Sequence, residues 1–122
     1  MDVNQYVELI KCIKINDEIV TAVEEIFGVS LNDELKRIVS IVLDDYFIGK
    51  NCRVISVKEM LNTEEYTGVD FTDINMIPLA DCCDADYIVY NFGTQKYEMY
   101  NIFDEVSFRE ADNLKEMLET LA

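Results

Sequence analysis

The chain has 122 residues, half of them hydrophobic, so it is long enough to bury one core without metal ions or disulfide bonds. Ten Lys and Arg residues face 25 Asp and Glu residues, and the resulting formal net charge of −15 repels nucleic acids and anionic membranes but attracts basic partners. The chain has no histidine, which removes the commonest general base and the Ser-His and Cys-His nucleophile pairs.

The N-terminal third of the sequence predicts three helices. Residues 3–15 and 17–27 place apolar side chains at helical spacing. Asp2 precedes the first run as an N-cap, and Gly28 follows the second run where a C-cap glycine belongs. The segment 30–33, Ser-Leu-Asn-Asp, resembles a capping box that opens a third helix.

The middle of the chain changes its hydrophobic period. Residues 52–55 form a short β-like run. Ser56 and Glu59 are spaced as a second capping box, which predicts a short helix through residues 60–61. Residues 62–75 are polar and acidic, and we expect them to form a long loop.

The C-terminal part predicts strands. Residues 76–80, 87–92 and 97–102 are rich in Tyr, Ile, Val and Phe, and Gly-Thr-Gln at 93–95 indicates a hairpin turn between the last two. Pro78 cannot donate a hydrogen bond to a strand ladder, so its strand is expected at an edge or to start there.

A last helix is expected after these strands. Ser-Phe-Arg-Glu at 107–110 is spaced as a third capping box, and Phe108, Leu114, Leu118 and Leu121 are expected to face inward. The predicted fold class is therefore α+β: a single domain over residues 1–122, with N-terminal helices packed on a small, mostly antiparallel sheet and a C-terminal helix. The aromatic face formed by Tyr87, Tyr97 and Tyr100 is expected to be either a dimer surface or covered by the helices.

The stretch 76–92 carries three carboxylates, Asp81, Asp84 and Asp86, which raises the question of a metal site. A calcium loop needs carboxylates at its positions 1, 3 and 5, but Cys83 and Ala85 occupy the third and fifth positions after Asp81. Aspartates also suit turns, because their side chains accept hydrogen bonds from nearby backbone N–H groups. We therefore favour a strand, a turn and a strand, with no metal or cofactor.

The cysteines do not form a recognisable zinc or redox motif. Cys82 and Cys83 are adjacent, whereas structural zinc sites use pairs that are spaced apart, and the chain has no C-x-x-C motif. Cys12 and Cys52 are expected to fill core space. Cys82 and Cys83 are expected at the turn, one facing inward and one outward.

The N-terminus has no basic region followed by an apolar run, and no window approaches the ~18 apolar residues of a membrane span. We therefore expect a cytoplasmic protein with reduced cysteines and no membrane partner.

The sequence resembles the SUKH superfamily, a domain shared by a fungal cell-wall synthesis regulator and many bacterial proteins, over about residues 19–121. The most specific feature is Ile-Pro-Leu-Ala-Asp at 77–81, followed by an acidic turn and the strand Asp-Tyr-Ile-Val-Tyr at 86–90. Weaker features are the helix end at 23–28 and the helix start at 31–35. An aromatic residue near the start of a Leu-rich final helix also fits: Phe108, Leu114 and Leu118. The chain departs from the family pattern at three places. Asn32 stands where proline is usual, and Asp44-Asp45-Tyr46 stands where an Asn-Gly segment is often found. Cys82, Cys83 and Ala85 replace the usual glycines of the acidic turn.

The resemblance implies a non-enzymatic binding domain, because bacterial members are mostly immunity proteins that neutralise a cognate toxin. The partner expected here is a basic protein toxin, such as a nuclease, and the acidic charge agrees with this independently. The candidate contact residues are acids with neighbouring aromatics: Asp44, Asp45, Tyr46, Glu64, Glu65, Tyr66, Asp81, Asp84 and Asp86. Two alternatives stay open: a regulatory or scaffold domain that binds a different cellular protein, and a metal-dependent enzyme using the acids near residues 81–86. The oligomeric state is not predicted.

Overall fold

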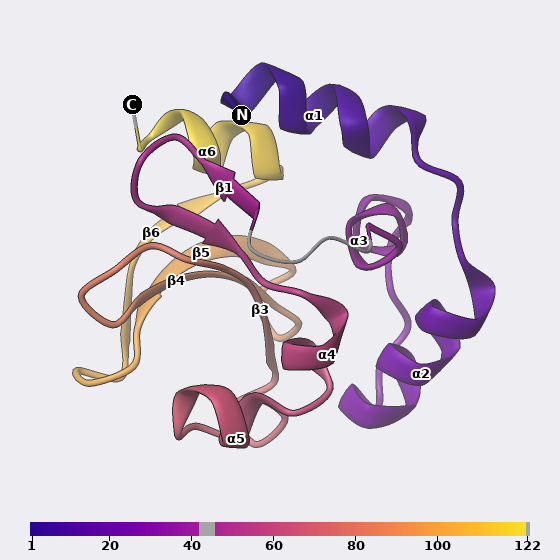
Figure 1. The fold of residues 1–122 in the computed structure, drawn as a ribbon. Helices are drawn as coiled ribbons and strands as arrows, with labels where there is room; N and C mark the ends of the chain where they lie inside the picture. Colours follow the sequence, from indigo (N-terminus) through magenta and orange to yellow (C-terminus); the bar gives the residue numbers. More distant parts are fainter. Residues whose placement is uncertain (42–45, 122) are drawn as a thin grey trace.

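The computed structural model describes residues 1–41 and 46–121. The N-terminal part forms three helices, α1 (Val3–Cys12), α2 (Asp17–Phe27) and α3 (Asp33–Val39), which wrap one side of the molecule (Figure 1). The predicted caps at Asp2 and Gly28 are confirmed: the Asp2 carboxylate accepts a hydrogen bond from the backbone N–H of Gln5, and Gly28 adopts a left-handed φ of +66°.

The sheet is a six-stranded antiparallel meander in which every strand pairs with its neighbours along the chain. Its strands are β1 (Tyr46–Ile48), β2 (Cys52–Val54), β3 (Met76–Asp81), β4 (Asp86–Asn91), β5 (Lys96–Asn101) and β6 (Val106–Ala111). The strands expected at 76–80, 87–92 and 97–102 are confirmed as β3, β4 and β5, and the short run at 52–55 is confirmed as β2.

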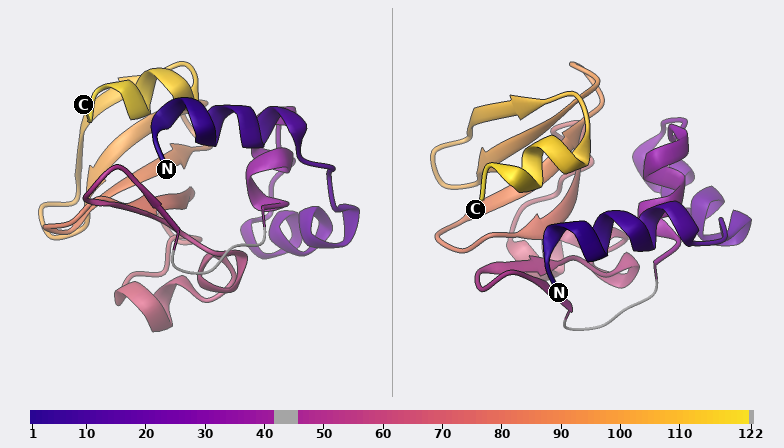
Figure 2. Two further views of the ribbon diagram at one scale, coloured as in Figure 1. Left: turned by 45° about the horizontal axis from the view of Figure 1, so that its top comes forward. Right: turned by 90° about the horizontal axis from the view of Figure 1, so that it is seen from above.

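Helices cover both faces of this sheet, as Figures 1 and 2 show. The C-terminal helix α6 (Leu114–Glu119) contacts β5 and β6 and lies beside α1, while the short helices α4 (Val57–Met60) and α5 (Thr63–Thr67) lie on the opposite side. This is the predicted α+β architecture in a single compact domain. Within residues 1–41 and 46–121, no helix combines the length and the apolar character needed to cross a membrane.

The core runs through the centre of the sheet, where the middle residues of β3, β4 and β5 are buried on both faces. Phe71 lies in the segment expected to be a polar loop, but its side chain is fully buried, with ring centroids 5.8 Å from Tyr87 and 6.5 Å from Tyr100. The expectation that Tyr87, Tyr97 and Tyr100 share one face is wrong: Tyr87 pairs with Tyr100 on the Phe71 side of the sheet, whereas Tyr97 pairs with Tyr90 on the other side. All three tyrosines are buried within one chain, so they do not form an exposed dimer surface.

The expectation that 107–110 opens the last helix is wrong. Residues 106–111 form strand β6, in which Ser107 pairs with Tyr100 and Glu110 pairs with Glu98. The C-terminal helix begins at Leu114, after the N-cap Asn113. The backbone hydrogen bonds of β6 with the edge of β5 outweigh the local capping pattern. Phe108, expected to face inward, has a side chain that is 50% exposed.

Four smaller expectations also need correction. Cys12 is exposed at the end of α1 rather than buried in the core. The loop expected at 62–75 contains helix α5, and the third helix is capped by Asn32 rather than Ser30. Pro78 lies inside the sheet, where it is tolerated because β2 ends at Val54, before the position that would lie opposite Pro78.

Candidate binding surface at the turn end of the sheet

Three hairpin turns meet at one end of the sheet because the meander places alternate turns together. The β1–β2 turn (residues 49–51) contacts the β3–β4 turn (residues 82–85) through a hydrogen bond from Cys83 Sγ to the Asn51 carbonyl at 3.3 Å. The β5–β6 turn (residues 102–105) contacts the same β3–β4 turn through the Ile102 N–H, which donates to the Ala85 carbonyl at 3.0 Å. The β3–β4 turn is therefore the centre of this end of the molecule.

Asn101 holds the β3–β4 and β5–β6 turns in a fixed relation. Its Nδ2 donates to Asp86 Oδ1 at 2.8 Å and to the Asp84 carbonyl at 3.3 Å. Its Oδ1 accepts from the backbone N–H groups of Phe103 at 3.0 Å and Asp104 at 2.9 Å. One amide side chain thus serves four polar groups, which limits the relative motion of the two turns.

The β3–β4 turn has an unusual backbone, with three consecutive non-glycine residues at positive φ. The φ values are +73° at Cys83, +53° at Asp84 and +67° at Ala85. Each such residue costs roughly 1–2 kcal/mol relative to ordinary helical or extended backbone. The cost is offset by backbone bonds that close the turn, since Asp86 N–H donates to the Cys83 carbonyl at 2.9 Å and Cys82 N–H donates to the Asp86 carbonyl at 2.8 Å.

The side chains of these turns form an acidic surface with one aromatic residue projecting from it. Phe103 is 83% exposed at the tip of the β5–β6 turn, and Glu105 beside it has a φ of +56°. We define the turn-end surface as the exposed or half-buried residues of this region: Asp84, Asp86, Phe103, Asp104 and Glu105. In the three turns themselves, Lys50 is the one cationic residue.

Asp81, which also belongs to the predicted contact set, is the last residue of β3 and lies close to the Arg53 side chain. Arg53 forms a bidentate pair with Glu59, with Nη1 2.5 Å from Oε1 and Nη2 3.1 Å from Oε2. Arg53 Nη2 also lies 3.7 Å from Asp81 Oδ2. The hydrogen bonds that Arg53 donates to Glu59 raise the pKa of Arg53, so the guanidinium stays charged and offsets much of the negative charge of Glu59 and Asp81.

Burial and the nearby charged side chains shift the pKa values of Tyr87 and Tyr100, the tyrosines next to these turns. Burial raises the pKa of Tyr87, and the Asp81 carboxylate raises it further while Arg53 opposes the shift. Burial also raises the pKa of Tyr100, with a further contribution from Glu105. Both phenols therefore stay neutral throughout the physiological range and act as apolar supports for the turns.

The structure brings together only part of the predicted contact set. Asp81, Asp84 and Asp86 lie at the turn end, whereas Glu64, Glu65 and Tyr66 lie exposed on α5, on another part of the surface (Figure 1). Tyr46 is half-buried at the start of β1, where its hydroxyl lies 2.7 Å from Met1 Sδ. Asp44 and Asp45 lie outside the described residues.

Sequence reasoning missed Phe103, Asp104 and Glu105. A local signal exists, because an Asn such as Asn101 is typical of a turn in which its side chain accepts hydrogen bonds from backbone N–H groups two or three residues later. The helix start expected at 107–110 is not compatible with a hairpin turn at 102–105 that leads into a strand. Its position beside residues 82–85 follows only from the strand order of the sheet.

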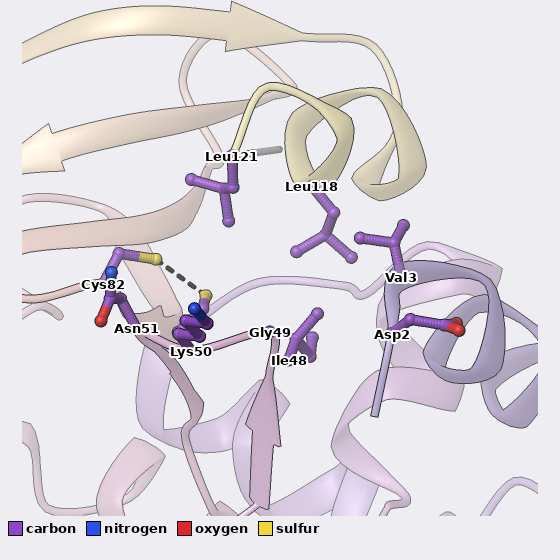
Figure 3. Close-up of a pocket in the computed structure, with 10 residues that line it drawn as sticks. Asp2, Val3, Ile48, Gly49, Lys50, Asn51, Cys82, Leu118 and Leu121 are labelled. Atoms are coloured by element: carbon purple, nitrogen blue, oxygen red, sulfur yellow. Dashed lines mark hydrogen bonds between the residues drawn. The ribbon is translucent and has the colours of Figure 1, made fainter.

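A pocket lies close to the turns, between α1, α6 and the β1–β2 hairpin (Figure 3). Its volume is about 460 Å³, and its apolar walls are Val3, Ile48, Leu118 and Leu121. Cys52 and Cys82 also line the pocket, and their sulfur atoms are in hydrogen-bond contact. In the part of the chain that the structure describes, no group of three or more His, Cys, Asp or Glu side chains is arranged to hold a metal ion.

A scan against protein-family models gives no match for this chain. Comparisons with curated proteins and with solved structures give no significant match either. The functional argument therefore depends on the geometry and charge of the turn-end surface.

Proposed function

We propose that this protein binds a basic protein partner through the turn-end surface. The observation that carries the proposal is Phe103, a large apolar side chain held 83% exposed among acids on a turn fixed by Asn101. Exposed aromatics on rigid supports are typical binding anchors, because they bury a large area at a small entropic cost. The surrounding carboxylates would pair with Lys and Arg of the partner and would speed its approach.

Within this class, we propose an immunity protein that neutralises a cognate toxin by stoichiometric occlusion. The support comes from the resemblance of residues 77–81 and 86–90 to the SUKH superfamily and from the net charge of −15. A nuclease toxin must attract phosphate and so presents a basic active site. An acidic body seated on that site would mask it and repel the nucleic acid that it replaces.

The experiment starts by isolating the partner on immobilised protein at low and at physiological salt, followed by identification of what is retained. The affinity of the purified pair is then measured for the native chain and for Phe103→Ala. We expect Phe103→Ala to weaken binding at least tenfold, since truncating an anchor costs about 1.4 kcal/mol or more. The matched control is Phe47→Ala, which removes a 46% exposed phenylalanine from the opposite edge strand and should change the affinity less than twofold.

A second pair of variants tests the contribution of charge. Asp104→Asn with Glu105→Gln removes two charges from the turn-end surface, while Glu64→Gln with Glu65→Gln removes two from α5. We expect the first pair to weaken binding and flatten its salt dependence more than the second. Equal effects would mean that only the overall charge matters and would contradict the proposed surface.

The activity of the isolated partner separates immunity from scaffolding. Loss of that activity at one equivalent of this protein is the result expected for a toxin inhibitor. A stable complex with an unimpaired partner would instead favour a regulatory or scaffold domain. Retention of no basic protein at either salt concentration would refute the proposal as a whole.

A further inference from the structure

Cys52 is the first residue of β2, and Cys82 directly follows the neighbouring antiparallel strand β3, so the two side chains lie close together. The register of β2 and β3 pairs Arg53 with Asp81, so continuing it by one residue places Cys52 opposite Cys82. Their sulfur atoms are 2.8 Å apart and form a thiol–thiol contact, and both residues line the pocket.

The backbone geometry of this pair suits a covalent bond. Directly opposed residues of antiparallel strands have Cα atoms about 4.5–5.5 Å apart. Disulfides need a Cα separation of about 4.4–6.8 Å, so the two sulfurs could be joined without moving either strand.

The other two cysteines are placed differently. Cys12 is exposed on α1, and Cys83 is exposed with its Sγ turned to the Asn51 carbonyl. Cys83 is also the neighbour of Cys82 in the chain, where a bond between adjacent residues is strained. Of the described cysteines, the fold therefore pairs only Cys52 with Cys82.

We infer that Cys52 and Cys82 are a modification site, a reversible disulfide that forms when a hydroperoxide reaches the pocket. The Cys82 sulfur attacks the peroxide O–O bond, becomes a sulfenic acid, and releases an alcohol or water. The Cys52 sulfur then attacks the sulfenic sulfur, and water leaves as the S–S bond forms. The two thiols together lose two electrons and form the disulfide. The hydroperoxide gains these electrons and gives one alcohol and one water, or two waters when the oxidant is hydrogen peroxide. The inference does not depend on the proposed function.

The surroundings define which sulfur reacts first and how fast. Cys52 is buried, whereas Cys82 is only half-buried, so Cys82 is the sulfur that an oxidant meets. The pocket of about 460 Å³ is large enough for a small hydroperoxide. The hydrogen bond with Cys52, together with burial, raises the pKa of the Cys82 thiol, so the thiolate is scarce and oxidation should be slow at neutral pH.

The bond would fasten two parts of the fold that are far apart in the sequence. It would close the loop from Cys52 to Cys82, which contains α4, α5 and the buried Phe71. Closing a loop of this kind restricts the unfolded chain, so we expect oxidation to raise the melting temperature by about 5 °C or more.

The test exposes the purified native chain to hydrogen peroxide, alkylates the remaining thiols, and maps the cross-linked peptides by mass spectrometry. We expect a single intrachain bond between Cys52 and Cys82, a higher melting temperature, and full reversal by dithiothreitol. The controls Cys12→Ser and Cys83→Ser should retain the bond, and Cys82→Ser should lose it. A bond through Cys83 or Cys12, over-oxidation of Cys82 without a bond, or a melting temperature that does not rise would each overturn the inference.

Discussion

Ala85→Gly should stabilise the protein, because Ala85 lies in the strained β3–β4 turn at a φ of +67°. Releasing an L-residue from the left-handed region returns roughly 1–2 kcal/mol, while the greater freedom of glycine in the unfolded chain costs about 0.5–1 kcal/mol. The substitution removes only one methyl group from a half-buried side chain, so little packing is lost. The expected net gain is about 0.5–1 kcal/mol, which corresponds to a rise of roughly 2–5 °C in melting temperature.

The gain should be measured by urea unfolding with circular dichroism and tyrosine fluorescence, since the chain has no tryptophan. The matched control is Ala111→Gly, at a half-buried strand position of β6 without positive φ, which should lose about 0.5–1 kcal/mol. If Ala85→Gly were destabilised as much as Ala111→Gly, the turn would not hold residue 85 in the left-handed region, and the reasoning about strain would fail.

Three further predictions concern the core and the charge pairs. Arg53→Met should lower the free energy of unfolding by about 2 kcal/mol, measured in urea, because it leaves the largely buried Glu59 carboxylate without its cationic partner. Adding Glu59→Leu should restore most of this stability, and no recovery would contradict the pairing. Tyr97→Phe should change stability by less than about 0.5 kcal/mol, because this buried hydroxyl has no well-formed hydrogen bond among the described residues; a loss above 1 kcal/mol would show that a partner exists. Burial raises the pKa of both Tyr6 and Tyr97, so the stability they contribute is complete below pH ~10, the ordinary tyrosine value, and falls as the pH rises above it. In a chain carrying Tyr46→Phe and Tyr66→Phe, which removes the two more exposed phenols, tyrosinate absorbance should then appear together with loss of circular dichroism in an alkaline titration, and its appearance in the folded chain would refute the burial argument.

Local signals predicted much of the fold. Asp2 and Gly28 mark helix ends, and the Ser56 side chain caps α4 as its sequence pattern indicates. Such signals act within a few residues, so they can be read without knowledge of the rest of the chain. The central strands were also predicted, because their β-branched and aromatic residues favour a half-buried pleated surface regardless of the partner strand.

The errors arose where distant parts of the chain decide the outcome. Residues 107–110 have a helix-start pattern, but the free edge of β5 offers a ladder that the local pattern does not reveal. Phe71 lies in a turn, as expected for its segment, but its polar sequence neighbours do not indicate that its side chain is buried against Tyr87 and Tyr100. The acids at 84 and 86 were visible in the sequence, but their proximity to Phe103 depends on the order of the strands.

The composition of the β3–β4 turn supports a role for its side chains. Glycine would meet the backbone requirement at residues 83–85 at lower conformational cost, yet the turn has Cys, Asp and Ala at positive φ. Strain of this kind persists when the surrounding structure over-determines it, and it gathers at functional sites. Here Asn101 and the bond from Cys83 to the Asn51 carbonyl hold the strained turn against both neighbouring turns. The acid at position 84 is thus presented on a rigid support beside Phe103, which is the arrangement that a preorganised binding surface requires.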